Sequence, residues 1–348
     1  MLAQLGRVVL LPAVAVLVWA AEPQIMPAGD AAVWVERETY VMGTRLRATV
    51  AGDDAAAAVA AIEQVFTAVR IVDARLSTWR DDTELSRLNR APVGVPQRLS
   101  PSLFALLREV RRWRDTTGGA FDPAIGALVD AWDLRGVGRR PGPADLVRAR
   151  RAGGMERLPL DEIGRSARRT AAAAWIDAGA FGKGAALREA RRVLDSAGVR
   201  AALLNFGGQV LAVGTGRDGT AWRIPVAHPS RRGLPAAFLR LREQSAATTA
   251  QSERFVEVDG VRYGHVLDPR TGLPVPAWGS VTVVAEDPLA ADILSTALFV
   301  LGPDSGMEWL EHRPGIAALF LIERDGAVTY RWTQAMEHYA VGVKASEN

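Results

Sequence analysis

A glycine-rich stretch around Lys183 carries the first residues whose types and spacing could do chemistry. Residues 177–184 read Asp-Ala-Gly-Ala-Phe-Gly-Lys-Gly, and the pattern predicts an apolar strand, a turn and then a helix. Glycines let backbone N–H groups approach an anion, and a helix start attracts negative charge. Lys183 would add a full positive charge, and Lys344 is the only other lysine. The stretch predicts a phosphate-binding turn, with tight helix–strand packing as the alternative.

Asp292 and Thr296 lie four residues apart in a helix predicted over 287–301, so both side chains share one helix face. Their neighbours are apolar, and a carboxylate buried among apolar residues must be capped, paired or bound to a metal. A carboxylate with a hydroxyl suits a hard cation such as Mg²⁺, although Mn²⁺ or Ca²⁺ accepts the same ligand types. The alternative is an acidic residue that the dipole of the helix N-terminus favours.

His265 and Asp268 lie where a strand predicted from the alternation over 261–265 ends. Residues 268–272, Asp-Pro-Arg-Thr-Gly, predict a tight turn. A histidine three residues from an acid can act as a general base, whereas Asp268 alone can simply hold its own turn. Any imidazole chemistry must come from the chain's four histidines, which are His228, His265, His312 and His338.

Three shorter stretches are ambiguous when taken singly. Residues 118–123, Gly-Gly-Ala-Phe-Asp-Pro, predict the end of a helix followed by a turn. Met42 lies at a kink in Met-Gly-Thr, and Trp79 lies in a loop predicted over 77–82. Such side chains are usually core residues, but a tryptophan in an exposed loop can stack on a flat ring.

The elements that must position these residues follow from hydrophobic periodicity. Strands and helices mix without strict alternation, which favours an α+β fold over a doubly wound sheet. The arginine-rich stretch 148–169 predicts a solvated face. Helices are predicted over 55–76, 83–89, 100–117, the run before 132, 184–197 and 287–301; strands are predicted over 33–50, up to 175–176, over 201–206, repeatedly over 209–266, and around 317–322 and 327–332.

The composition is that of a globular protein, with 348 residues of which 49% are hydrophobic and 23% charged. These values exclude a disordered, collagen-like or coiled-coil chain. The absence of cysteine excludes disulfides, thiolate metal sites and a cysteine nucleophile. A net charge of +3 is small for this length, so no nucleic-acid partner is expected.

The N-terminus predicts export from the cytoplasm. Arg7 precedes an apolar run from Val8 to Ala21 that ends in small residues, which is the pattern of a signal peptide. We expect a signal over 1–21 with cleavage near 20–21, a linker over 22–32 and one domain over 33–340. The run is short for a membrane span, which needs about 20 apolar residues. An uncleaved anchor is the alternative, and both place the domain in the periplasm or another extracytoplasmic compartment.

In order and together, seven segments resemble the ApbE family, the FAD:protein FMN transferases. The resemblance covers nearly all of the chain after the predicted signal. It implies a two-part α+β fold with FAD between the parts and Mg²⁺ at the pyrophosphate. The segments are VMGT (41–44), LSTWRDDTELSRLN (76–89), GGAFDPAIGALVDAW (118–132), IDAGAFGKGAA (176–186), LLNFGG (203–208), YGHVLDPRTGLP (263–274) and DILSTALFVLG (292–302).

The resemblance also implies the activity and the residues that perform it. Relatives transfer FMN from FAD to a threonine, or sometimes serine, hydroxyl of a target protein and release AMP; the targets are typically membrane-associated redox subunits. The metal positions fall on the Ala180 carbonyl, Asp292 and Thr296. The histidine implicated in chemistry falls on His265, which we expect Asp268 to orient. The flavin-contacting positions fall on Met42, Trp79, Ala120, Phe121, Asp122, Asp177, Lys183 and Leu267.

The chain departs from the family pattern at two places. Gly264 stands where relatives often have the first of two adjacent histidines. A Thr-Ser-Gly stretch of the family appears as Thr-Thr-Ala at 248–250, followed by Gln-Ser-Glu-Arg at 251–254. Two other functions stay open. A Mg²⁺-dependent FAD pyrophosphatase would use the same metal site with water in place of the protein hydroxyl, and the altered stretch leaves open a non-catalytic flavin-binding protein.

Overall fold

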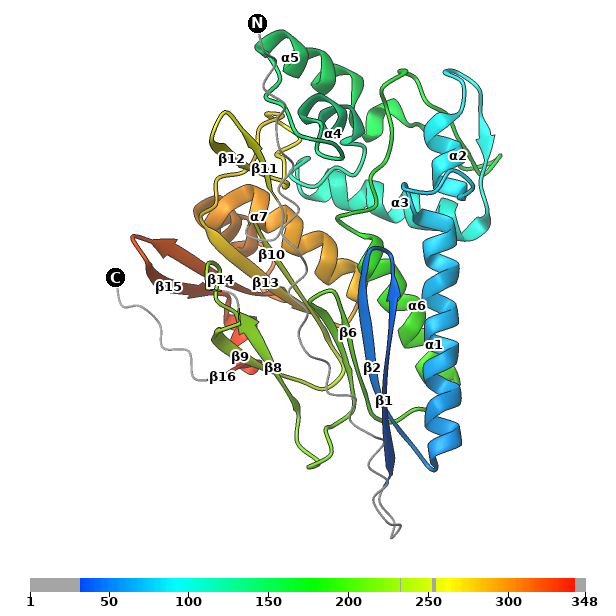
Figure 1. The fold of residues 1–348 in the computed structure, drawn as a ribbon, viewed down its shortest axis with the longest axis vertical. Helices are drawn as coiled ribbons and strands as arrows, with labels where there is room; N and C mark the ends of the chain where they lie inside the picture. The colour runs from blue at the N-terminus through cyan, green and yellow to red at the C-terminus, as the bar shows by residue number, and fades with distance from the viewer. Residues whose placement is uncertain (1–31, 232, 252–254, 342–348) are drawn as a thin grey trace, which may run out of the picture.

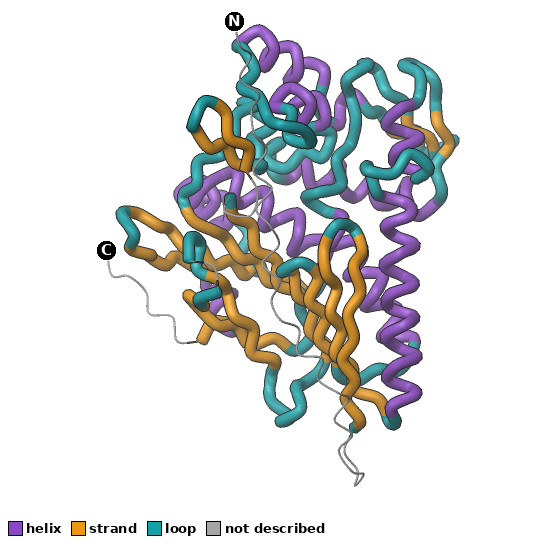
Figure 2. Tube along the Cα trace, in the orientation of Figure 1, coloured by secondary structure: helices purple, strands orange, loops and turns teal. Residues whose placement is uncertain are grey.

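A large antiparallel sheet forms the body of the protein (Figures 1 and 2). The computed structural model describes residues 32–231, 233–251 and 255–341, so the predicted signal and nearly all of the predicted linker lie outside the described residues. The strand order is β1-β2-β6-β7-β10-β13-β14-β15. These strands are β1 (Val33–Val41), β2 (Thr44–Gly52), β6 (Ala202–Phe206), β7 (Gln209–Val213), β10 (Ser245–Ala250), β13 (Gly279–Ala285), β14 (Ala317–Arg324) and β15 (Ala327–Trp332).

Three helices cover one face of this sheet: α1 (Ala55–Leu76), α6 (Gly182–Ser196) and α7 (Pro288–Glu311). The apolar faces of α1 and α6 pack against strands β2 and β6 in the largest core cluster, and α7 packs against β10 and β13. The guanidinium of Arg188 on α6 joins Glu109 to Asp287, the residue that caps the N-terminus of α7. The helices that carry Lys183 and Asp292 are thereby held side by side.

The opposite face packs against a small sheet of order β16-β9-β8, formed by β8 (Trp222–Ala227), β9 (Pro235–Leu241) and β16 (Ala340–Val341). A second group of elements, which we call the upper lobe, lies beyond the ends of the sheet strands (Figure 1). It comprises α2 (Glu84–Arg90), α3 (Pro101–Thr116), α4 (Gly126–Trp132), α5 (Pro143–Ala152), the short strands β3 (Gln97–Arg98), β4 (Leu160–Asp161) and β5 (Ser166–Ala167), and the hairpin β11 (Phe255–Val258) and β12 (Val261–Gly264).

Helix α1 is, among the described residues, the one helix that is long and apolar enough to cross a membrane. Its buried residues recur at helical spacing from Ala58 to Leu76 and pack into the core between the sheet and α6. Burial of this face in the protein accounts for its apolar character.

Most of the predicted elements are confirmed, two predictions are corrected, and one helix was not predicted. No strand ends at Trp175-Ile176, because Ile176 pairs with a side chain instead: Asn89 donates to its carbonyl and accepts from its N–H, both at 2.8 Å. The helix predicted over 287–301 resumes beyond Gly302, a glycine with φ of 78° that kinks α7. Helix α5, where the sequence analysis predicted no helix, begins with Pro143 at its first position.

Candidate active site

A cavity of about 690 Å³ lies between the sheet with its helices and the upper lobe. The β1–β2 turn, the start of α6, the end of β10 and one face of α7 line it from the sheet side, and the loops around α4 and the 265–269 segment line it from the lobe. Every predicted site residue except Asp268 lines this cavity. These residues are Met42, Trp79, Ala120, Phe121, Asp122, Asp177, Ala180, Lys183, His265, Leu267, Asp292 and Thr296.

Lys183 and Asp292 meet on one wall of the cavity. The ammonium Nζ of Lys183 lies 3.6 Å from Oδ1 of Asp292, whose side chain is 5% exposed. The second oxygen, Oδ2, accepts a hydrogen bond of 2.8 Å from the backbone N–H of Gly184. The buried carboxylate is therefore both paired and hydrogen-bonded, which is the condition for burying a charge.

Gly184 makes this meeting possible because it leaves space between α6 and α7. A Cβ at position 184 would lie 2.6 Å from the carbonyl oxygen of Pro288 and 2.8 Å from Cα of Leu289. Both of these are backbone atoms, which cannot swing aside as a side chain can. The glycine after Lys183 thus lets the N-terminal turn of α6 lie directly against α7.

The donor set at this wall fits a hard divalent cation. Asp292 supplies a carboxylate, Thr296 a hydroxyl, and Ala180 a backbone carbonyl, and all three residues line the same cavity. Oxygen donors of these kinds are the ligands of Mg²⁺, which commonly takes one or two carboxylates and completes its shell with water and substrate phosphates. The residues described include no cluster of three or more acidic, histidine or cysteine ligands.

Arg135 organises the wall around Trp79 and Asp177. Its guanidinium donates at 2.6 Å to Oδ2 of Asp177, and at 3.0 and 2.6 Å to the carbonyl and hydroxyl of Thr78. The same group lies 4.7 Å from the ring centre of Trp79 and 4.4 Å from that of Trp175. Trp79 is 71% exposed and lines the cavity, so one guanidinium holds an exposed aromatic surface there.

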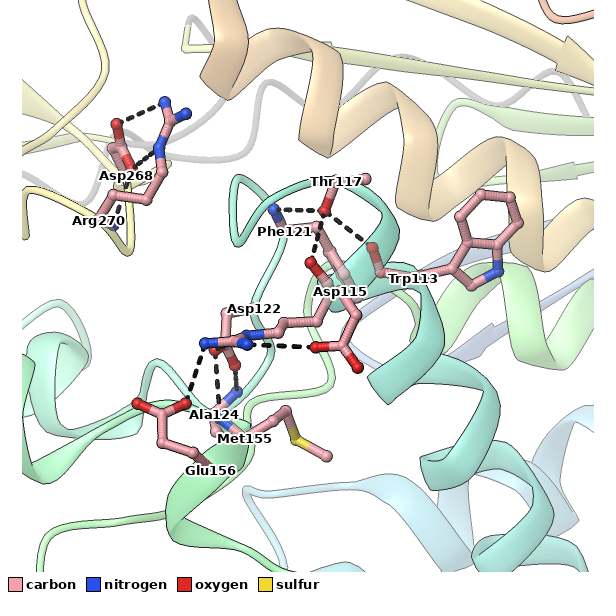
Figure 3. Close-up of polar contacts among 11 residues, drawn as sticks. Trp113, Asp115, Thr117, Phe121, Asp122, Ala124, Met155, Glu156, Asp268 and Arg270 are labelled. Atoms are coloured by element: carbon pink, nitrogen blue, oxygen red, sulfur yellow. Dashed lines mark hydrogen bonds and ion pairs between the residues drawn. The ribbon is translucent and has the colours of Figure 1, made fainter. Parts of the chain in front are cut away.

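Asp122 is a buried carboxylate in the loop between α3 and α4 (Figure 3). Its oxygens accept backbone hydrogen bonds of 2.9 Å from Ala124 and 3.1 Å from Met155, and Arg114 lies 3.2 Å away. Burial raises the pKa of Asp122 above its ordinary value, and the two backbone hydrogen bonds and Arg114 offset part of that increase. The carboxylate fixes the 121–124 turn beside the cavity.

His265 and Asp268 occupy the two ends of a short extended segment. His265 is half-buried and lines the cavity. Asp268 begins the predicted tight turn, in which Gly272 donates to its carbonyl at 2.7 Å. Both of its carboxylate oxygens accept from the side chain of Arg270 at 2.9 Å, as Figure 3 shows. Asp268 therefore holds the turn and Arg270, while its role toward His265 stays a prediction.

Comparisons with known proteins identify the family of this chain. The ApbE family model matches residues 42–320, which is most of the chain. A curated FAD:protein FMN transferase of Treponema pallidum is 34% identical over 304 residues, covering 82% of this chain and 84% of the relative.

The chain belongs to the ApbE family. A second relative of the same name, from Salmonella typhimurium, is 30% identical and covers 89% of both chains. Among solved structures, the ApbE flavin transferase of Vibrio cholerae superposes with a TM-score of 0.77 at 27% identity, over 88% of this chain and 99% of that one. The ApbE protein of Thermotoga maritima gives a TM-score of 0.80 at 26% identity, over 87% and 98%. The α+β architecture predicted from the sequence is therefore the ApbE fold.

Two residues beside the cavity of this ApbE chain escaped the sequence analysis. Arg135 belongs to none of the motifs described in the sequence analysis, and its partners Thr78 and Asp177 are distant in sequence. Gln251 follows β10 and binds the backbone beyond His265. Its place directly after the altered 248–250 stretch was the one available signal.

Proposed function

We propose that this chain transfers FMN from FAD to a threonine or serine hydroxyl of a target protein and releases AMP. The observation that carries the proposal is the meeting of Lys183, Asp292 and the start of α6 on one wall of a cavity with an exposed tryptophan. A cation and a helix N-terminus suit a diphosphate, and an aromatic face suits the flavin or adenine ring. Relatives of the family carry the name FAD:protein FMN transferase.

The chemical step is an in-line displacement at phosphorus. The target hydroxyl oxygen bonds to the phosphorus of the FMN half, the bond from that phosphorus to the bridging oxygen breaks, and AMP leaves with the bridging oxygen. His265, which lines the cavity, accepts the hydroxyl proton. Lys183 stabilises negative charge that spreads over the phosphate oxygens.

Mg²⁺ belongs to this proposal as the resident cation. The side chains of Asp292 and Thr296 and the carbonyl of Ala180 would hold it, in keeping with their oxygen donors and their place in the same cavity. When bound, the ion supplies Lewis-acid neutralisation of the diphosphate charge. Mn²⁺ accepts the same oxygen ligands, so this donor set does not distinguish the two ions.

The proposal includes an acceptor and a compartment. The resemblance to the family supports a membrane-associated redox subunit as the acceptor, and the export-signal pattern of residues 1–21 supports a location outside the cytoplasm. Detecting the chain in the periplasmic fraction, with or without a retained anchor, tests the location. Recovery in the cytoplasm alone contradicts it.

One incubation separates the proposed function from its two rivals. The chain is mixed with FAD, Mg²⁺ and a peptide that carries an acceptor threonine, and the products are resolved by chromatography and mass spectrometry. A flavin-labelled peptide with an equal amount of AMP supports the transferase. Free FMN with AMP supports the pyrophosphatase, and intact bound FAD supports a carrier.

A further inference from the structure

The two departures from the family pattern, at 250–251 and at 264, meet in space beside His265. A Cβ built on Gly264 would lie 2.1 Å from Oε1 of Gln251 and 2.2 Å from its Cδ. Gly264 does not have a positive φ, so a glycine is required at this position by the limited space and not by an unusual backbone conformation. The side-chain amide of Gln251 fills the volume that a side chain at 264 would need.

The amide of Gln251 is fully engaged with the backbone that follows His265. Its Nε2 donates to the carbonyls of Val266 at 2.8 Å and Val275 at 2.9 Å, and its Oε1 accepts from the N–H of Val266 at 3.1 Å. Gln251 is 6% exposed. Because three hydrogen bonds anchor a buried group, the amide cannot move aside cheaply to admit a side chain at 264.

These bonds join the two extended segments that flank the 268–272 turn. The N–H of Val275 also donates to the carbonyl of Val266 at 2.9 Å, so the amide lies in the same small ladder. His265 stands between Gly264, the most freely rotating residue type, and Val266, whose N–H and carbonyl both bind Gln251. The hydrogen bonds between Gln251 and Val266 therefore restrict the backbone next to His265, whose side chain lines the cavity.

We propose that Gln251 is the positioning residue for His265, and that Gly264 is glycine because the amide of Gln251 occupies the adjacent space. The inference rests on the proposed function for the role of His265 in catalysis. In this chain the change at Gln251 and the glycine at 264, where relatives often have a histidine, are therefore two parts of one contact beside His265.

The positioning role of Gln251 is tested by measuring both kcat for FMN transfer and the Kd for FAD. Gln251→Ala should lower kcat for FMN transfer by about 10- to 100-fold, since misplacement of a reacting group by about 1 Å has effects of that size. The Kd for FAD should change less than about threefold, because the amide does not line the cavity. Gln251→Met, which keeps the volume and lacks the amide, should lose as much and serves if the alanine variant does not fold. Gln244→Ala is the matched control, since this amide binds backbone N–H groups at the far end of β10.

A double-variant cycle tests the pairing with Gly264. Gly264→Ala alone should displace the amide and lower kcat as much as Gln251→Ala. The kcat of the double variant should be no lower than that of the less active single variant, because both changes disrupt the same contact between Gln251 and the backbone at 264–266. Two results would overturn the proposal. One is a double variant in which the losses of kcat from the two single variants multiply, and the other is a kcat within twofold of wild type for both Gln251 variants.

Histidine labelling decides the point even if the wild-type chain transfers no FMN. The chain has four histidines, so selectively labelled protein gives four ring signals, and His265 is assigned by its loss in His265→Ala. Gln251→Met should shift or broaden the His265 signal and leave the other three in place. An unchanged His265 signal in this variant refutes the positioning role, whereas absent transfer by the wild type refutes only the proposed function.

Discussion

Lys183 and Asp292 belong to different helices, yet the ammonium of one lies 3.6 Å from the carboxylate of the other at the wall of the large cavity. The contact depends on Gly184, whose N–H binds the same carboxylate and whose missing side chain admits α7. A buried acid held between a cation and a backbone donor is a built feature and not a solvated helix end. The helix-dipole alternative for Asp292 therefore does not account for its surroundings.

Asp292→Asn should lower FMN transfer by at least about 100-fold. The amide oxygen can still accept from the N–H of Gly184, so the fold is retained while the carboxylate charge that a divalent cation needs is lost. Flavin-labelled peptide formed at several Mg²⁺ concentrations measures the effect. Asp195→Asn, at an exposed ion pair on α6, is the control. Full activity of Asp292→Asn at ordinary Mg²⁺ would refute the metal role.

His265→Ala should slow transfer by about 100- to 10,000-fold, the range of general acid–base catalysis, and should leave FAD affinity near that of wild type. In the proposed mechanism, the imidazole accepts a proton from the target hydroxyl and is not needed to bind the dinucleotide. Transfer rate and FAD titration on the same sample measure the two quantities. Equal losses of rate and affinity would instead assign His265 a structural role.

Arg135→Ala should weaken FAD binding by about tenfold. A charged hydrogen bond to Asp177 and the stacking on Trp79 are both lost, and each contributes about 1 kcal/mol or more. Quenching of tryptophan fluorescence by FAD measures the affinity. Arg140→Ala removes an exposed arginine of the same loop and should have no effect. Unchanged quenching in Arg135→Ala would show that Trp79 and Asp177 need no such support.

Gly184→Ala should destabilise the fold by about 1–3 kcal/mol, the usual effect of overpacking a close contact. The added Cβ would meet the backbone of Pro288 and Leu289, so α6 and α7 must separate. Unfolding in urea measures the change. Gly315→Ala, where a Cβ has no neighbour within 4 Å, is the matched control. Equal stability of the two variants would mean that the helices are not held at this distance in solution.

The stability contributed by Asp122 should fall as pH rises through the acidic range. Because burial raises the pKa of Asp122 in the folded state, the folded protein binds its proton more tightly than the unfolded chain does. The contribution is full below the ordinary pKa of about 3.9 and is lost above the raised value. The difference in unfolding free energy between wild type and Asp122→Ala should therefore shrink as the pH rises from the ordinary pKa through the raised pKa of Asp122. A growing difference would mean that Arg114 outweighs burial.

The local elements and most of the site could be predicted from the sequence. Helix α1, the Met42-Gly43 hairpin turn and the 268–272 turn follow from periodicity and turn residues within a few positions of one another. The cavity residues could be named because the seven segments resemble a family whose sites are distributed along the chain. That inference came from order and resemblance, and not from any one pattern.

The sequence could not reveal the contacts that depend on residues far apart in the chain. The partners of Arg135 became neighbours only when α4, the 77–79 loop and the 175–177 segment packed together. Residues 175–176 look like the end of an apolar strand in sequence, whereas the backbone of Ile176 binds the side chain of Asn89. Likewise, the sequence shows only that Gly264 lacks the histidine that relatives often have. The structure shows that the amide of Gln251 fills the space beside it.

A crystal structure of the chain with FAD and Mn²⁺ tests the central claim most directly. The anomalous signal of manganese should appear beside Asp292 and Thr296, with the FAD diphosphate between that ion and Lys183 and the phosphorus of the FMN half facing His265. A diphosphate bound away from the 180–184 turn, or manganese bound elsewhere with FAD still in the cavity, would contradict the account.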